Sequence, residues 1–130
     1  MTNLFTSVCY SPMQHFHAHV YFLPADLMIA QVFAEKASLN SVFHYVKLYE
    51  KAVGPHPMAM IELHFGEQAS AAAAHWIEVN HQKFSVLIHE DTGDDVKDHS
   101  EYIRWIGPSL PIDLGFFELI KSRPDLRVHQ

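Results

Sequence analysis

The sequence predicts a single α+β domain, and three observations support this class. The chain has 130 residues, 48% of them hydrophobic, which suffices for one domain with its own core. Residues 15–22 alternate strictly between apolar and polar side chains, as strands do. Two later segments repeat apolar residues every three or four positions, as helices do. We therefore expect an N-terminal arm at 1–14, the domain at 15–120 and a polar tail at 121–130.

The first predicted strand has two unlike faces. Phe16, Ala18, Val20 and Phe22 lie on one face, and His15, His17, His19 and Tyr21 lie on the other. Pro24 ends the strand and begins a helix that extends to Asn40. The apolar stripe of this helix is expected to cover the apolar face, which leaves a face of imidazoles on the opposite side.

The next segments predict a hairpin, a second helix and a fourth strand. Residues 43–53 and 58–65 are expected to form strands around the rigid turn Gly54-Pro55-His56-Pro57. Residues 67–79 predict a helix, and residues 84–89 predict a strand with His89 on its polar side. This β-α-β-β-α-β order is that of the ferredoxin-like fold, in which an antiparallel sheet of order 4-1-3-2 has both helices on one face.

A C-terminal extension follows this minimal fold. A turn at residues 92–95 is expected to start a short helix that ends at Ile106, with His99 on its docking side. Trp105 should reach over the rim of the imidazole face. Residues 111–117 are expected to be extended.

Composition argues against several classes of partner. The chain carries 9 Lys and Arg against 15 Asp and Glu, a net charge of −6, so it lacks the basic surface that nucleic acid requires. No apolar stretch approaches 18 residues, so we expect no membrane insertion. The single cysteine, Cys9, excludes an internal disulfide framework, and with no export signal at the N-terminus we expect a cytoplasmic location.

The 11 histidines outnumber all lysines and arginines together, and the predicted topology gathers several on one face. In the 4-1-3-2 order the first strand lies between the third and the fourth, which brings His89 near His17. Neutral imidazoles with one carboxylate and no thiolate suit Fe(II), Zn or Mn. We expect the C-terminal segment and a second subunit, in an isologous homodimer, to cover this face. The polar groups on the face are His15, His17, His19, Glu62, His64 and His89.

Four groups of motifs follow one another along residues 15–117. They are His17-Ala18-His19-Val20-Tyr21-Phe22; Val53-Gly54-Pro55-His56-Pro57-Met58; Leu87-Ile88-His89 with Thr92-Gly93-Asp94-Asp95 and Asp98-His99; and Trp105-Ile106-Gly107-Pro108 with Leu110-Pro111-Ile112-Asp113-Leu114. This combination resembles the DOPA 4,5-dioxygenase family of fungi and bacteria. The resemblance implies a ferredoxin-like fold and extradiol cleavage of a catechol such as L-DOPA by O₂ at a non-haem Fe(II). Glu90 stands where the family usually has Pro, which puts the shape of the following loop in doubt.

The histidines are then expected to divide into ligands and proton-transfer groups. We expect His17, His19, His56 and His89 to bind Fe(II), or Zn or another divalent ion in its place, although three protein ligands are usual. His56 lies nearer Tyr21, at the other end of the first strand, and therefore also qualifies as a catalytic residue. His99 is the expected acid-base residue, and Tyr21 and Trp105 are expected to contact the substrate. We expect ordinary solvated or hydrogen-bonded side chains at His15, His44, His64, His75, His81 and His129.

Two other functions fit the same residues. One is a non-catalytic protein of this fold that binds a metal or a small ligand. The other is a cofactor-free, dimeric ferredoxin-like monooxygenase or isomerase, whose pocket would lie on the same face. The cofactor-free function predicts that no stoichiometric metal is bound.

Overall fold

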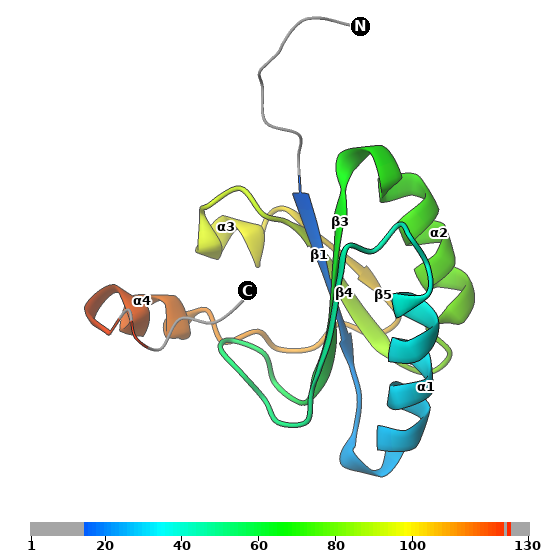
Figure 1. Cartoon of the computed structure of the whole chain (residues 1–130). Coiled ribbons are helices and arrows are strands. Elements are labelled where there is room, and N and C mark those ends of the chain that lie inside the picture. The colour runs from blue at the N-terminus through cyan, green and yellow to red at the C-terminus, as the bar shows by residue number, and fades with distance from the viewer. Residues whose placement is uncertain (1–14, 124, 126–130) are drawn as a thin grey trace, which may run out of the picture.

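A five-stranded antiparallel sheet divides the computed structural model into two sides (Figure 1). The structure describes residues 15–123 and 125, so the expected N-terminal arm and residues 124 and 126–130 of the expected tail lie outside it. The order of the strands is β2-β3-β1-β4-β5, which places β1 in the middle. The strands are β1 (His15–Tyr21), β2 (Tyr45–Tyr49), β3 (Met60–Gly66), β4 (Ser85–Glu90) and β5 (Ile103–Ile106).

Two helices cover one face of the sheet. They are α1 (Leu27–Ser38), which follows the 3-10 turn η1 (Pro24–Asp26), and α2 (Ser70–Asn80), which follows η2 (Glu67–Ala69). Figure 1 shows both on the same side. Beneath them the apolar residues of the strands form the main core, and each large side chain buried there contributes about 1.5–3 kcal/mol. Its fully buried members include Ala18, Val20, Ile61, Leu63 and Val86.

The opposite face is covered by the C-terminal part of the chain and by the loop between β2 and β3. This layer contains the short helices α3 (Asp95–Asp98) and α4 (Gly115–Ser122), on the left of Figure 1. The backbone N–H of Asp113 donates to the carbonyl of Pro55 at 2.8 Å and joins the two covering loops. A smaller apolar cluster around Tyr21, Met60 and Leu87 lies beneath them. The site described below is therefore enclosed between the sheet and these loops.

The α+β class and the antiparallel sheet are confirmed, but the C-terminal extension differs from the prediction. The helix expected to reach Ile106 ends at Asp98, and Ile103–Ile106 form β5, which pairs with β4. These four residues are rich in β-branched and aromatic side chains, and the edge of β4 offers them backbone hydrogen bonds. Trp105 therefore lies on a strand and not on a helix.

Two smaller differences concern the ends of elements. The strand expected at residues 43–53 is limited to β2, Tyr45–Tyr49. The segment 111–117, expected to be extended, turns into α4, which buries Phe117 and Ile120 and includes the first two residues of the expected tail. Among the described residues, no helix has the length and apolarity needed to cross a membrane.

Candidate metal centre

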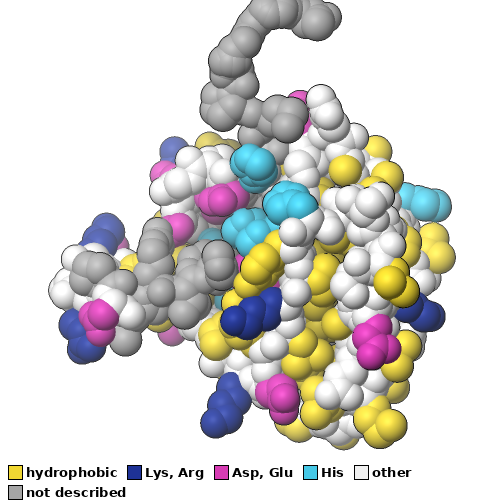
Figure 2. All heavy atoms as spheres, in the orientation of Figure 1, with side chains coloured by type: hydrophobic (Ala, Val, Ile, Leu, Met, Phe, Trp, Pro, Cys, Tyr) yellow, Lys and Arg dark blue, Asp and Glu magenta, His cyan; other side chains and the backbone are white. Residues whose placement is uncertain are grey.

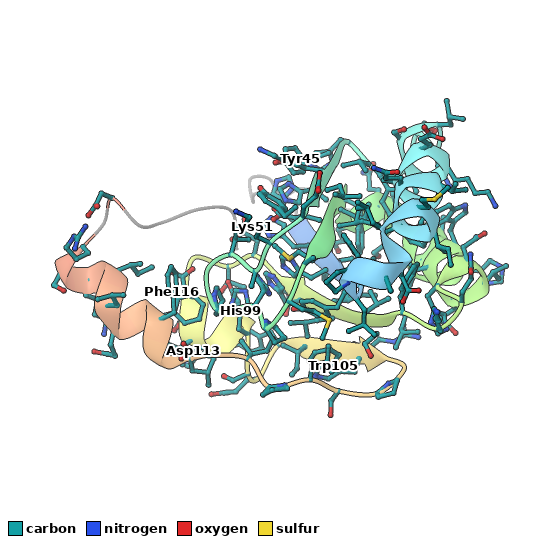
Figure 3. The ribbon with its side chains drawn as sticks, turned by 90° about the horizontal axis from the view of Figure 1, so that it is seen from below. Tyr45, Lys51, His99, Trp105, Asp113 and Phe116 are labelled. Carbon is teal, nitrogen blue, oxygen red and sulfur yellow. The ribbon has the colours of Figure 1, made fainter. Side chains whose placement is uncertain are left out.

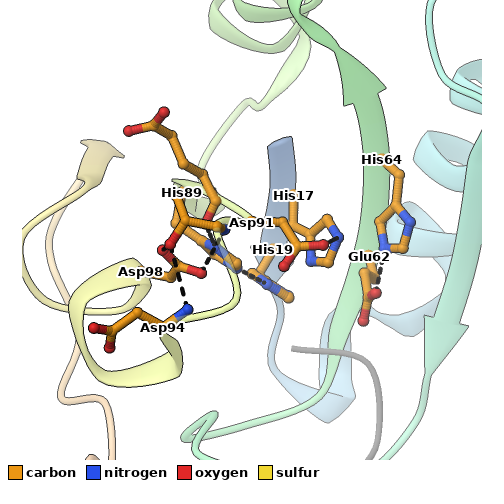
Figure 4. Close-up of polar contacts among 10 residues, drawn as sticks. His17, His19, Glu62, His64, His89, Asp91, Asp94 and Asp98 are labelled. Atoms are coloured by element: carbon orange, nitrogen blue, oxygen red, sulfur yellow. Dashed lines mark hydrogen bonds and ion pairs between the residues drawn. The ribbon is translucent and has the colours of Figure 1, made fainter. Parts of the chain in front are cut away.

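The register of the strands sets the histidines side by side. His17 lies opposite His64 on β3 and opposite His89 on β4, and His19 lies opposite Glu62. Because side chains two residues apart share a face, all of these lie on the side of the sheet away from α1 and α2 (Figure 4). The predicted gathering of these residues on one face, with His89 beside His17, is confirmed.

Two loops bring His56 and His99 to the same place. The ring centroid of His19 lies 4.1 Å from that of His56, and the centroids of His89 and His99 are 4.2 Å apart. His56 follows Gly54, whose φ of 56° lies in the left-handed region that favours glycine. Figure 3 shows His99 near Phe116 at the start of α4. With His17, the group comprises five buried histidines.

The loop that carries His99 is held by a buried carboxylate. Asp98 accepts a hydrogen bond from the backbone N–H of Thr92 at 2.8 Å and another from the side-chain hydroxyl of Thr92 at 2.5 Å. Asp94 caps α3 by accepting from the backbone N–H of Lys97 at 3.1 Å. These bonds offset the burial of Asp98 and place His99, the next residue, over the sheet.

Ring nitrogens converge in two overlapping triads. One consists of His17, His19 and His89, and the other of His19, His56 and His99; in each, one ring nitrogen per residue lies within 4.8 Å of the others. The Nε2 atoms of His19 and His89 are 2.9 Å apart. That separation is close to that of two neighbouring ligands held at a right angle, each about 2.1 Å from a shared ion.

Hydrogen bonds at the outer ring nitrogens set the state of the inner ones. Nδ1 of His89 donates to the carbonyl of Glu90 at 2.8 Å, and Nδ1 of His99 donates to the carbonyl of Asp95 at 2.8 Å. A carbonyl only accepts, so each Nδ1 carries the proton and Nε2 of the neutral ring keeps its lone pair. Metal-binding histidines are typically held by such outer bonds.

The surroundings of the two ring nitrogens of His56 indicate whether a cation fits this site. Its Nδ1 lies 2.7 Å from the hydroxyl of Tyr21. Its Nε2 is buried and has no hydrogen-bond partner among the described residues. A buried polar atom in that state costs about 1–3 kcal/mol, and coordination of a cation would offset the cost. The residues present therefore fit a divalent ion.

Burial keeps two histidines of the cluster uncharged. Burial, and next the neighbouring His56 and His89, hold the pKa of His19 well below its usual value. Burial, and next the neighbouring His99, lower the pKa of His56 to about 3. Neutral imidazole is the form that binds a metal. These two rings therefore need not lose a proton at neutral pH before they bind a metal ion.

Glu62 and His64 extend the site toward β2. Glu62 is fully buried, and its Oε2 contacts Nε2 of His64. The ring of His64 stacks on that of His17, with centroids 3.8 Å apart and planes within 7°. We expected an ordinary solvated or hydrogen-bonded side chain at His64; the side chain is 12% exposed and contacts Glu62, so it is the hydrogen-bonded kind. The signal available in the sequence was its place beside Glu62 on the face that also carries His17 and His19.

Beyond this stack, a pocket of about 280 Å³ opens beside the site. It is lined by His15, His17, His44, His64 and Asp91. Nε2 of His17 lies 3.5 Å from Oδ2 of Asp91. Figure 2 shows histidine and acidic side chains gathered at the surface near the start of the described chain. This pocket meets the cluster of five histidines at His17.

The other expected residues lie outside the cluster or at its far end. Tyr21 contacts His56, its pKa is raised by burial, and its ring centroid lies 6.0 Å from that of Trp105. His75 is exposed on α2, and Nδ1 of His81 donates to the carbonyl of Phe84 at 2.9 Å, as expected of ordinary side chains. His129 lies outside the described residues.

A family profile and two curated relatives match this chain. The profile of the Dopa 4,5-dioxygenase family matches residues 16–116. The DOPA 4,5-dioxygenase of Amanita muscaria is 26% identical in an alignment of length 114, and the match covers 81% of this chain and 50% of that protein. An uncharacterized 21.2 kDa protein of Botryotinia fuckeliana is 31% identical in an alignment of length 85, and the match covers 59% of this chain and 46% of that protein. The chain thus spans about half the length of these two relatives.

A solved structure has a similar fold. The crystal structure of a protein from Nostoc punctiforme, described as a candidate dioxygenase, superposes with a TM-score of 0.73 at 30% sequence identity. The match covers 83% of this chain and 94% of that one.

Proposed function

We propose that this chain, which belongs to the Dopa 4,5-dioxygenase family, is a metal-dependent extradiol dioxygenase that opens the ring of a DOPA-like catechol with O₂. Membership and the named relatives place it among dioxygenase-like proteins. The observation that carries the finer proposal is the group of five buried imidazoles whose nitrogens converge around His19.

We assign the metal to His17, His19 and His89. Their nitrogens form one of the triads, and the 2.9 Å between the Nε2 atoms of His19 and His89 supports a shared ion. The proposed ion is Fe(II), and Zn or another divalent ion can occupy the same donors. When bound, Fe(II) would supply the redox chemistry between O₂ and an electron-rich ring. His56 stays an alternative fourth ligand.

We assign proton transfer to His56 and His99. A catechol must give up protons to bind as an anion, and the ring-opened product must regain one. His56 is neutral and, as its lowered pKa implies, a weak base, so it would pass a proton on to the hydroxyl of Tyr21 beside Nδ1 as it takes one up at its buried Nε2. Nδ1 of His99 donates to the carbonyl of Asp95, which leaves Nε2 of that ring for the same task. The apolar cluster around Tyr21 and Trp105 would exclude water and contact the aromatic ring.

Anaerobic loading with Fe(II), followed by O₂ uptake with a panel of catechols, tests the function. We expect about one ion per chain and O₂ consumption that depends on the catechol. His17→Ala and His89→Ala should lose the metal, whereas His75→Ala, on the exposed surface of α2, should keep it. If both ligand variants hold the ion as tightly as the unmodified chain, the assignment is wrong.

The same assay separates the alternatives. A chain that binds metal but consumes no O₂ with any catechol would be a non-catalytic metal-binding protein. A chain that consumes O₂ without bound metal would be a cofactor-free monooxygenase.

We also propose that the chain is a cytoplasmic isologous homodimer. The short α3, α4 and two loops are a thin cover for one sheet face, and a second copy would complete it. Sedimentation at micromolar concentration should give the mass of two chains. A single species of 14.9 kDa would contradict the dimer.

A further inference from the structure

We propose that Glu62 and His64 are positioning residues that hold the ring of His17 in place to bind the metal. This inference rests on the metal role proposed for His17. It concerns the side of the site toward β2, where Figure 4 shows His64 beside His17 and in contact with Glu62.

A row of side chains crosses four strands at this place. Tyr45 on β2 lies opposite His64 on β3, His64 lies opposite His17 on β1, and His17 lies opposite His89 on β4. The ring of His64 is sandwiched in this row. Its centroid lies 4.2 Å from that of Tyr45, with planes at 23°, and 3.8 Å from that of His17, with planes at 7°. Directly opposed side chains on neighbouring strands support one another in this way.

The partners of His17 on its other sides meet it differently. The rings of His19 and His89 lie at 76° and 68° to the ring of His17, with centroids 6.2 Å and 5.2 Å away. These edge-on contacts do not support the face of the His17 ring. The parallel ring of His64 provides that support, because any tilt of His17 would drive its atoms into His64.

Glu62 in turn restrains His64. The carboxylate contacts Nε2 of His64, and the side chain of Glu62 is fully buried opposite His19. A buried carboxylate is strongly destabilised without a hydrogen-bond partner or a positive charge, so the contact is costly to break. Rotation of the His64 ring would break it. The orientation of His64, and through the stack that of His17, is therefore fixed by a group in the interior.

The same geometry argues that His64 supports a ligand and is not one itself. Stacking within 7° presents the faces of the two rings to each other, and Nε2 of His64 is already directed at Glu62. Ligation would require both nitrogens to point at one ion, although one donor atom each from His17, Glu62 and His64 lies within 4.8 Å of the others. Mutation of a residue that holds a metal ligand typically lowers metal affinity about 10- to 100-fold, and we expect an effect of this size.

The test compares His64→Ala, His64→Phe and Glu62→Gln in the full chain, with Co²⁺ as the probe ion. Affinity is measured by competition with a chelator, and the visible spectrum of bound Co²⁺ reports the geometry of its ligands. We expect His64→Ala to weaken binding about 10- to 100-fold and to change the spectrum. His64→Phe keeps a ring to stack on His17 but removes the contact with Glu62, so it should restore part of the affinity and the original spectrum. Glu62→Gln keeps a partner for His64 and should cause the smallest loss.

Controls separate positioning from ligation and from misfolding. His75→Ala should match the unmodified chain, and circular dichroism of the metal-free variants shows which of them fold. If His64→Ala does not fold, His64→Phe and Glu62→Gln carry the test.

Two results would overturn the inference. A folded His64→Phe that loses cobalt as completely as His17→Ala would make His64 a ligand. A folded His64→Ala variant with unchanged Co²⁺ affinity and spectrum would show that His64 does not position His17. If the unmodified chain itself binds no Co²⁺, the proposed metal function fails instead.

Discussion

The two faces of the sheet are made by the same strands but bury different chemistry. On β1, Ala18 and Val20 are buried against the helices, and His17 and His19 are buried on the other side. Apolar burial stabilises the fold, whereas burial of ring nitrogens costs free energy unless they are paired or coordinate a cation. The apolar face thus stabilises the fold. Part of this stability offsets the cost of burying the ring nitrogens close together on the histidine face.

Changing His19 should give the largest effect on function and a small one on folding. His19 belongs to both histidine triads, so His19→Ala should weaken divalent-ion binding by more than about 100-fold, beyond the range of outer partners, and abolish O₂ uptake. The free energy of unfolding of the metal-free chain should fall little, because a polar ring is removed from a dry site. Metal analysis and urea titration measure the two quantities. A His19→Ala chain that keeps its ion would contradict the assignment of metal binding to the histidine face.

The converse change lies on the apolar face. Leu63 neighbours Glu62 and His64 in β3 but is fully buried in the main core. Leu63→Ala should lower the free energy of unfolding by about 2–5 kcal/mol, the usual range for a cavity in a core. The folded fraction should still bind one ion per folded chain. Metal loss out of proportion to unfolding would mean that the two faces are more strongly coupled than we infer.

Within the histidine face, His99 separates proton transfer from ligation. His99→Ala should keep near-normal iron content, while turnover falls by about 100-fold or more, as for a lost acid-base group. Iron analysis and single-turnover kinetics on the same preparation check both parts. Loss of iron in step with activity would make His99 a ligand, with His19 and His56 as the other members of its triad.

Acid should affect the two faces unequally. In the metal-free chain the pKa of His56 is lowered from 6.5 to about 3 and that of His19 is also lowered. Below about pH 6.5 the unfolded chain therefore binds more protons than the folded one, so the free energy of unfolding should decrease as the pH falls toward 3. Urea titrations at several pH values should show this slope, a smaller slope in His19→Ala, and an unchanged slope in Leu63→Ala. Equal slopes in all three chains would contradict the burial of neutral imidazoles.

Several features of the site followed from the sequence because they depend on local geometry. Alternation along residues 15–22 assigns His17 and His19 to one face whatever the rest of the chain does. The β-α-β-β-α-β order then brought His89 beside His17, as the register confirms. At Glu90, where the family usually has Pro, Nδ1 of His89 donates to the backbone carbonyl, a group that either residue has.

The errors came where a local pattern fits two structures. Residues 96–106 carry apolar side chains at helical spacing, yet Ile103–Ile106 form an edge strand, because pairing with β4 supplies hydrogen bonds that a short isolated helix lacks. His64 was placed on the right face, but its stacking on Tyr45 could not be predicted, because Tyr45 comes from another strand.

The sequence by itself determined which residues share a face of the sheet, because the period of a strand is independent of its surroundings. Only the tertiary structure decided that His56 and His99 reach His19 and that His64 stacks on His17. These distances depend on contacts between segments far apart in the chain, such as the bond from Asp113 to Pro55, and on loop closure by Thr92 and Asp98. No local pattern encodes such contacts, because their geometry results from packing the whole chain around one core.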